Sequence, residues 1–140
     1  SCLPCVPGSF QNDSGWNSCM KCPVNTFSNS SSSTSCHTCK IGELAVEMGS
    51  VKCQKCGAGQ FGRVCDKCNY GQYRAGDDID STRCLSCPNG FHQDTLGASS
   101  CLPCVPGRAQ NQWSQRYCNA CPMNEYANTT EMSNCVECPV

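Results

Sequence analysis

The 140-residue sequence has few of the side chains that build the core of a globular enzyme. Leu, Ile, Val and Phe together contribute 19 residues, and 18 of the residues that count as hydrophobic are cysteines. This leaves too little apolar surface for one shared core in a chain of this length. We therefore expect no enzyme domain organised around such a core, no catalytic residues and no cofactor.

Clusters of charge and long apolar runs are missing as well. The net charge is −1 and the ten Lys and Arg residues are scattered singly, whereas nucleic acids and anionic membranes bind clustered cations. No stretch approaches the 18 apolar residues of a membrane span. We expect neither nucleic acid nor direct membrane insertion. The chain has neither an initiator Met nor a signal-like leader, so a mature product or a segment of a longer chain is expected.

The sequence is rich in one residue, cysteine, at a level typical of a disulfide scaffold. Every cysteine belongs to a Cys-x-x-Cys pair, and the first cysteines of successive pairs lie 17, 17, 17, 12, 19, 17, 17 and 17 residues apart. The pairs are Cys2/Cys5, Cys19/Cys22, Cys36/Cys39, Cys53/Cys56, Cys65/Cys68, Cys84/Cys87, Cys101/Cys104, Cys118/Cys121 and Cys135/Cys138. The spacing predicts a tandem array of short repeats.

A longer period overlies the short one. The octapeptide SCLPCVPG opens the chain and returns 99 residues later, and residues 1–41 and 100–140 share 17 identities, of which six are cysteines. We interpret residues 1–99 as a super-repeat of six units and residues 100–140 as the start of a second.

Each unit has the same internal pattern when residues are counted from the second cysteine of its opening pair. Position 3 is Gly or Asn in all eight complete units, which predicts a tight turn with a left-handed residue. Position 5 is aromatic in five units, the aromatic stands at position 4 in a sixth (Phe91), and Leu44 and Ala109 depart from the rule. Only Ile41 to Met48 resembles a turn or two of helix. The predicted fold class is a small disulfide-rich repeat protein, an elongated rod of irregular loops and short β-hairpins with little or no helix.

This pattern resembles the ephrin-receptor-like cysteine-rich repeat, in which Cys-x-x-Cys-Pro-x-Gly-x-Phe/Tyr leads to the next Cys-x-x-Cys. The segments at Cys22 to Cys39 and Cys121 to Cys138 match a variant with Asn in place of Gly. The chain also resembles the disulfide modules of tumour-necrosis-factor receptors and, more distantly, EGF-like modules. The resemblance implies an extracellular module type and no single function. The short loop between Cys56 and Cys65, and Ala109 in place of the aromatic, depart from the pattern.

Cys-x-x-Cys pairs also occur in zinc sites and in redox centres. Zinc would use the pairs two at a time and leave the ninth pair over, and a thioredoxin-like centre needs one reactive pair on a βαβ scaffold. Three N-glycosylation sequons begin at Asn12, Asn29 and Asn128, and the last two are equivalent at the 99-residue offset. These sequons favour the secretory pathway and therefore disulfides.

Two disulfide schemes are open. The resemblance to tumour-necrosis-factor-receptor modules implies that the second cysteine of each pair joins the first cysteine of the next. The bonds would be Cys5 to Cys19, Cys22 to Cys36, Cys39 to Cys53, Cys56 to Cys65, Cys68 to Cys84, Cys87 to Cys101, Cys104 to Cys118 and Cys121 to Cys135. Cys2 and Cys138 would then bond outside this sequence. In the alternative, consecutive pairs interlock, with Cys2 to Cys19 and Cys5 to Cys22. Closing a 15-residue loop stabilises the fold by roughly 3 kcal/mol.

Few other residues suggest chemistry. We interpret His37 and His92 as exposed polar side chains. The cluster of Asp77, Asp78 and Asp80 lacks the calcium-loop pattern, so no metal is predicted. The two tryptophans, Trp16 and Trp113, are interpreted as packing over disulfides, with partner anchoring as the alternative.

Two functional hypotheses follow. The first is a non-enzymatic, secreted or cell-surface structural glycoprotein, part of a stalk, fibre or filament, whose partners are other copies or further repeats, N-linked glycans and O-linked glycans on Ser28 to Ser35. The second is a receptor or adhesion ectodomain that binds a protein ligand. The 99-residue duplication favours the first, because copying whole blocks adds length.

Overall fold

The computed structural model describes residues 4–11 and 18–140. The chain divides into two compact units, one made of Ser1–Cys56 and Gly62–Cys65, the other of Gly57–Phe61 and Asp66–Val140. This division follows packing, whereas the 99-residue period concerns duplication of the sequence, so the predicted super-repeats stay a prediction.

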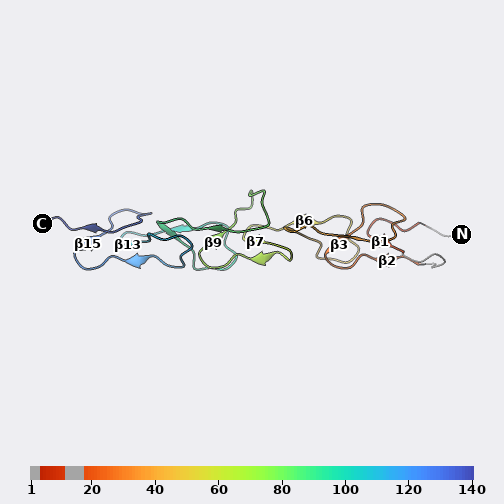
Figure 1. Ribbon diagram of the computed structural model, residues 1–140, viewed down its shortest axis with the longest axis horizontal. Coiled ribbons are helices and arrows are strands. Elements are labelled where there is room, and N and C mark those ends of the chain that lie inside the picture. Colours follow the sequence, from red (N-terminus) through yellow and green to blue (C-terminus); the bar gives the residue numbers. More distant parts are fainter. Residues whose placement is uncertain (1–3, 12–17) are drawn as a thin grey trace. The chain divides into compact units, whose positions relative to one another are not determined.

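Sixteen two-residue strands form eight separate antiparallel hairpins within the described residues, which contain no helix (Figure 1). The first four hairpins pair β1 Ser9–Phe10 with β2 Met20–Lys21, β3 Thr26–Phe27 with β4 His37–Thr38, β5 Glu43–Leu44 with β6 Gln54–Lys55, and β7 Gln60–Phe61 with β8 Asp66–Lys67. The other four pair β9 Gln72–Tyr73 with β10 Leu85–Ser86, β11 Phe91–His92 with β12 Leu102–Pro103, β13 Arg108–Ala109 with β14 Asn119–Ala120, and β15 Glu125–Tyr126 with β16 Val136–Glu137. The predicted fold class of disulfide-rich hairpin repeats is confirmed.

The register explains the Cys-x-x-Cys spacing. The first strand of each hairpin occupies positions 4 and 5 of a repeat, and the second strand is the two residues between the cysteines of the next pair. Thr26, for example, lies opposite Thr38, and Phe27 opposite His37. The two-residue spacer is therefore a strand, and the cysteines that flank it lie at the ends of the hairpin.

The turn predicted at position 3 is present in all eight repeats. Position 3 has a positive φ, between 66° and 91°, and the N–H of position 4 donates to the carbonyl of position 1. One positive φ at the third of four residues defines a type II turn, which selects Gly or Asn. The residues are Gly8, Asn25, Gly42, Gly59, Gly71, Gly90, Gly107 and Asn124. This prediction is confirmed.

The segment Ile41 to Met48 forms no helix, which corrects the one helical interpretation of the sequence. Gly42 has a φ of 91° and opens the turn that leads into β5. Glu43 then pairs with Lys55. A left-handed residue and a cross-strand partner both exclude a continuous helix, so the repeat overrides the local helix propensity.

The core of the repeats consists of cysteines and of position 6 side chains. Cysteines that open a repeat are nearly all buried, seven of the eight being at most 6% exposed. Position 6 is buried in six repeats, where it is Ser28, Ala45, Arg74, Gln93, Gln110 or Ala127. Disulfides and hydrogen-bonded polar side chains thus take the place of the apolar core that the composition lacks.

Neighbouring repeats are joined by recurrent backbone hydrogen bonds. Each repeat is named after the cysteine at which it begins. In the Cys87 repeat, the Gly90 N–H donates to the Gln110 carbonyl at 2.7 Å, and the Cys104 N–H donates to the Gly90 carbonyl at 2.9 Å. The same pair of bonds recurs from the Cys5 repeat to the Cys104 repeat. The turn glycine therefore uses both of its polar backbone groups to bind the next repeat.

Contacts also reach beyond the neighbouring repeat, to the second repeat along the chain. The carbonyl oxygen of Glu131 lies so close to Gly90 that a Cβ on Gly90 would be 2.3 Å from it. Glu131 itself donates its N–H to the Cys104 carbonyl of the intervening repeat at 3.0 Å. Equivalent close approaches join Gly8 to Gly49, Gly59 to Gly97, and Gly71 to Ser114. One backbone segment at position 10 thus connects three successive repeats.

Candidate functional site

The disulfides follow the successive scheme that the resemblance implies, and the interlocked alternative does not occur among the described residues. The bonds are Cys5–Cys19, Cys22–Cys36, Cys39–Cys53, Cys56–Cys65, Cys68–Cys84, Cys87–Cys101, Cys104–Cys118 and Cys121–Cys135. Their Cα–Cα distances, 5.3 to 5.9 Å, are ordinary for disulfides. Cys138 is exposed and unbonded within the described residues, and Cys2 lies outside them.

One cluster has the ligand types of a metal site, but its chemistry is that of a disulfide. His92, Cys104 and Cys118 lie together, with His92 Nδ1 3.2 Å from Cys118 Sγ. The two sulfurs are bonded to each other, so neither is a thiolate that can bind zinc. The interpretation of His92 as an exposed side chain is wrong, because it is half-buried against this disulfide, whereas His37 is exposed beside the Phe27 ring.

Arg74 organises the irregular middle of the array. It occupies position 6 of the Cys68 repeat and is 2% exposed. Its guanidinium donates hydrogen bonds to the carbonyls of Gly57 and Gln60 in the preceding turn, and to those of Asp78 and Asp80 in its own loop. The cation thus ties the two repeats that the 12-residue and 19-residue steps distort, by binding backbone carbonyls from both.

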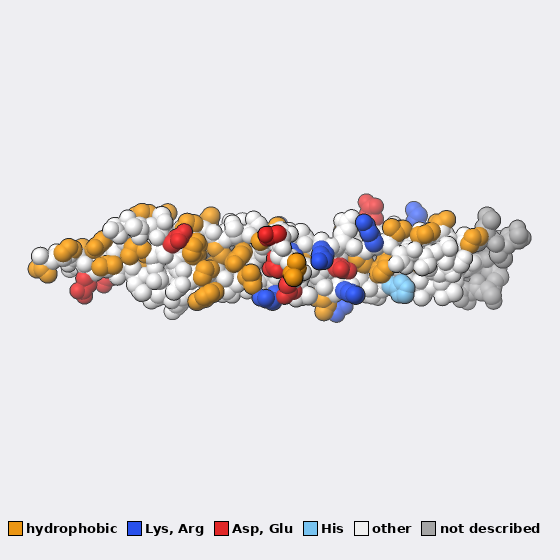
Figure 2. Space-filling view, turned by 90° about the horizontal axis from the view of Figure 1, so that it is seen from above, with side chains coloured by type: hydrophobic (Ala, Val, Ile, Leu, Met, Phe, Trp, Pro, Cys, Tyr) orange, Lys and Arg blue, Asp and Glu red, His pale blue; other side chains and the backbone are white. Residues whose placement is uncertain are grey.

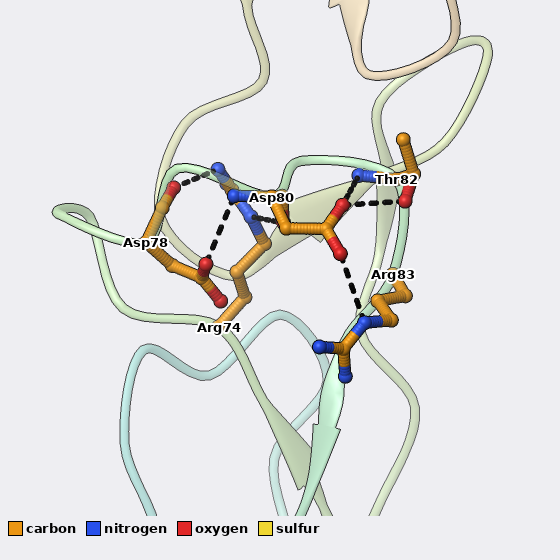
Figure 3. A network of polar contacts seen from close by, with 5 residues as sticks. All are labelled: Arg74, Asp78, Asp80, Thr82 and Arg83. Carbon is orange, nitrogen blue, oxygen red and sulfur yellow. Dashed lines mark hydrogen bonds and ion pairs between the residues drawn. The ribbon is translucent and has the colours of Figure 1, made fainter.

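Two residues of the acidic cluster, Asp78 and Asp80, are part of the same network (Figure 3). Asp78 accepts a hydrogen bond from the Asp80 N–H, and the Asp80 carboxylate accepts from Thr82 and pairs with Arg83. The Thr82 hydroxyl and N–H, with Arg83, lower the pKa of Asp80 below its ordinary value of 3.8. These carboxylates therefore serve the fold of the loop and bind its own donors.

A second polar cluster links the loops of three successive repeats. Arg116 forms an ion pair with Asp94, and its guanidinium lies 3.8 Å from the centre of the Tyr70 ring and 5.1 Å from that of Tyr117. Its hydrogen bond lowers the pKa of Asp94 below 3.8. Trp113, in the same loop, is 60% exposed, which contradicts the expectation that it packs over a disulfide. Trp16 lies outside the described residues.

Large apolar side chains remain at the surface throughout the described residues. Tyr117 is 55% exposed and Met123 90%, and Figure 2 shows hydrophobic side chains dispersed among polar ones over the visible face. No helix among residues 4–11 and 18–140 is long and apolar enough to cross a membrane.

Two of the sequons lie on exposed loops that follow the first strand of a hairpin. Asn29 and Asn128 are both exposed, each at position 7 of its repeat. Asn12 lies outside the described residues. Within the Ser-rich loop, Ser28 is buried and its hydroxyl lies 2.6 Å from that of Ser33, so part of this loop is held by its own hydrogen bonds.

Two features of the repeats were not predicted from the sequence. Position 6 holds residues as different as Ala45, Arg74 and Gln93, so no pattern marks it as core. Position 10 has a positive φ in non-glycine residues, 59° at Ser32 and 65° at Glu131. In the sequence, only the glycines Gly49 and Gly97 at position 10 indicate that this position has a positive φ.

A comparison with protein families identifies the family of these repeats. The model of the family described as tyrosine-protein kinase ephrin type A/B receptor-like matches residues 1–39 and 76–115, more than half of the chain. The chain belongs to this family. The comparison with curated proteins gives no match.

As an ephrin-receptor-like module, the chain is a disulfide-rich domain of the extracellular space or the cell surface. The family is a receptor-like cysteine-rich module and not an enzyme family. The matched segments include the regular repeats at the amino terminus and the stretch from the long loop to residue 115, whereas residues 40–75, which contain the shortened repeat, and residues 116–140 lie outside them.

Proposed function

We propose that the chain is a non-enzymatic segment of an extracellular structural glycoprotein, in which ephrin-receptor-like repeats add length to a stalk, fibre or filament. The observation that carries the proposal is the recurrent bonding of repeats. The same two backbone hydrogen bonds join each repeat to the next. In addition, the backbone of position 10 contacts the turn glycine of the repeat that lies two places earlier in the chain. Such contacts do not depend on the number of repeats, so an array can grow without a new core.

Local disulfides support the same function. Every regular bond closes a loop with a sequence separation of 14 residues, so stability is supplied within each repeat. An array of this kind withstands heat and protease while it is oxidised and collapses when it is reduced. These are properties that a load-bearing extracellular segment needs. The partners proposed are further repeats or copies of the same polypeptide, with N-linked glycans on Asn12, Asn29 and Asn128.

A second candidate function is a receptor or adhesion ectodomain that binds a protein. It is favoured by the exposed Trp113 and Tyr117 beside Arg116, because Trp, Tyr and Arg are the residues that most often dominate protein interfaces. The 99-residue duplication weighs toward the structural role, since a ligand site needs only one or two specialised repeats.

Electron microscopy of the protein purified from its natural source separates the two functions. The structural proposal predicts long uniform fibrils, or arrays whose length grows with repeat number. Isolated monomers that bind one protein saturably, with binding lost in the Trp113→Ala variant, would support the ectodomain instead.

A further inference from the structure

A groove lies beside one of the sequons. It has a volume of about 440 Å³ and is lined by Phe27, Asn29, His37, Thr38, Lys40 and Glu43, all from the β3–β4 hairpin and the turn that follows. This volume lies in the range of small-molecule sites, roughly 300–1,000 Å³. One wall is the Phe27 ring, which contacts His37 with centroids 5.6 Å apart. The groove thus offers an aromatic face and several polar groups next to an exposed asparagine.

All three sequons have the same relation to an aromatic residue. Asn29 follows Phe27 by two residues, Asn128 follows Tyr126 by two, and in the sequence Asn12 follows Phe10 by two. Residues two apart on an extended chain point to the same side. An asparagine at position 7 therefore shares a side of the hairpin with the aromatic at position 5. The repeat in which Ala109 replaces the aromatic has an asparagine at position 7 but no sequon there.

We propose that the first N-acetylglucosamine of a glycan on Asn29 lies in this groove, with the apolar C–H face of the sugar against the Phe27 ring. The inference rests on the proposed function, because only a secreted chain receives this glycan. Attachment joins Asn29 Nδ2 to the sugar C1, releases the lipid diphosphate of the oligosaccharide donor and gives up one amide proton. Tyr126 receives the first sugar on Asn128 in the same way.

The groove residues suit an N-acetylated sugar. Burying the C–H face against the aromatic ring removes apolar surface from water. His37, Lys40 and Glu43 on the other walls can exchange hydrogen bonds with the hydroxyl and acetamide groups. The sugar then covers the β3–β4 hairpin, which the Cys22–Cys36 disulfide closes, and stabilises it against opening.

A double-mutant cycle tests the packing. The chain is secreted from mammalian cells with high-mannose glycans, trimmed to a single N-acetylglucosamine and compared with Asn29→Gln, in the presence and absence of Phe27→Ala. We expect the sugar to slow amide exchange in β3 and β4 by roughly three- to tenfold with Phe27 present, and to have almost no effect in Phe27→Ala. Equal slowing in both backgrounds, or none in either, overturns the proposal.

Matched variants guard against a folding defect. Tyr126→Ala at the Asn128 sequon repeats the test at a ring that is 36% exposed, so its loss leaves the fold intact. Trp113→Ser creates a sequon at Asn111, at the same position but after Ala109, and a sugar there is expected to leave exchange in β13 and β14 unchanged.

The sugar site at Asn29 and the proposed structural role can be refuted independently of each other. An unoccupied Asn29 in the secreted protein, seen by intact mass, overturns the sugar site. Fibrils in electron micrographs would still support the structural role.

Discussion

The close approach of Gly90 to the second repeat along predicts that two chemically identical substitutions differ sharply in cost. Gly90 and Gly107 occupy the same turn position, with φ of 83° and 90°. Alanine at either position carries the left-handed strain of about 1–2 kcal/mol. At Gly107 the new Cβ meets nothing within 4 Å, whereas at Gly90 it would lie 2.3 Å from the Glu131 oxygen and 2.9 Å from its carbonyl carbon.

The clash adds to the strain because the neighbour is backbone that cannot rotate away. Relief requires the Cys121 repeat to move from the Cys87 repeat, and overpacking of this kind costs roughly 1–3 kcal/mol more. An extra cost of about 2 kcal/mol corresponds to about a thirtyfold larger open population. Gly90→Ala therefore destabilises the region by about 3–4 kcal/mol in all, and Gly107→Ala by the strain alone.

Native-state hydrogen exchange on the oxidised protein is the suitable assay, because an array of repeats need not unfold in one step. The reporters are the amides of Cys104 and Glu131, which bind the carbonyls of Gly90 and Cys104. Both exchange about thirtyfold faster in Gly90→Ala than in Gly107→Ala if the account is right. Equal acceleration in the two variants would refute the second-neighbour contact.

Three further predictions concern polar groups. Arg74→Ala leaves four part-buried carbonyls without this donor and costs about 4 kcal/mol in denaturant melts. Arg74→Lys, which lacks the planar fork, restores only part of this stability; a cost under about 1 kcal/mol for Arg74→Ala would refute the network. Gln110→Ala removes the partners of the Gln112 N–H and the Tyr117 carbonyl and costs about 2 kcal/mol. Gln110→Glu keeps the acceptor but buries a carboxylate against the Tyr117 carbonyl and costs at least as much; a neutral effect of either variant in denaturant melts would contradict these bonds. The hydrogen bond from Arg116 lowers the pKa of Asp94, so the ion pair's contribution to stability is complete above about pH 5 and disappears as the pH falls through the lowered pKa. Asp94→Asn should flatten this part of the curve of stability against pH, and an unchanged curve would exclude a contribution from the Asp94–Arg116 pair.

The features that the sequence predicts are those fixed within one repeat. Gly or Asn three residues after a cysteine is a local requirement of a type II turn, so Gly8 and Asn25 are recognisable without the structure. The successive disulfides were implied by the resemblance to tumour-necrosis-factor-receptor modules, and in the structure they join cysteines that each hairpin brings together.

The features that the sequence does not predict arise between repeats. Arg74 and Ala45 are buried at the same position because their backbones accept the same inter-repeat hydrogen bond, whatever the side chain. Glu131 adopts a positive φ because its N–H and carbonyl are each directed at a different repeat. Such a residue has none of the local preference that marks glycine. The expectation that Trp113 packs over a disulfide is wrong, because its loop leaves the side chain exposed.

Disulfide mapping is the most direct test of the central claim, which is that the chain is an array of repeats and that each repeat is closed by its own disulfide. Protein that has never been reduced is digested between the cysteine pairs with a protease of broad specificity, and linked peptides are identified by mass spectrometry. The account predicts the successive bonds, such as Cys22 with Cys36 and Cys104 with Cys118, in every repeat. Interlocked bonds, such as Cys5 with Cys22, would contradict it.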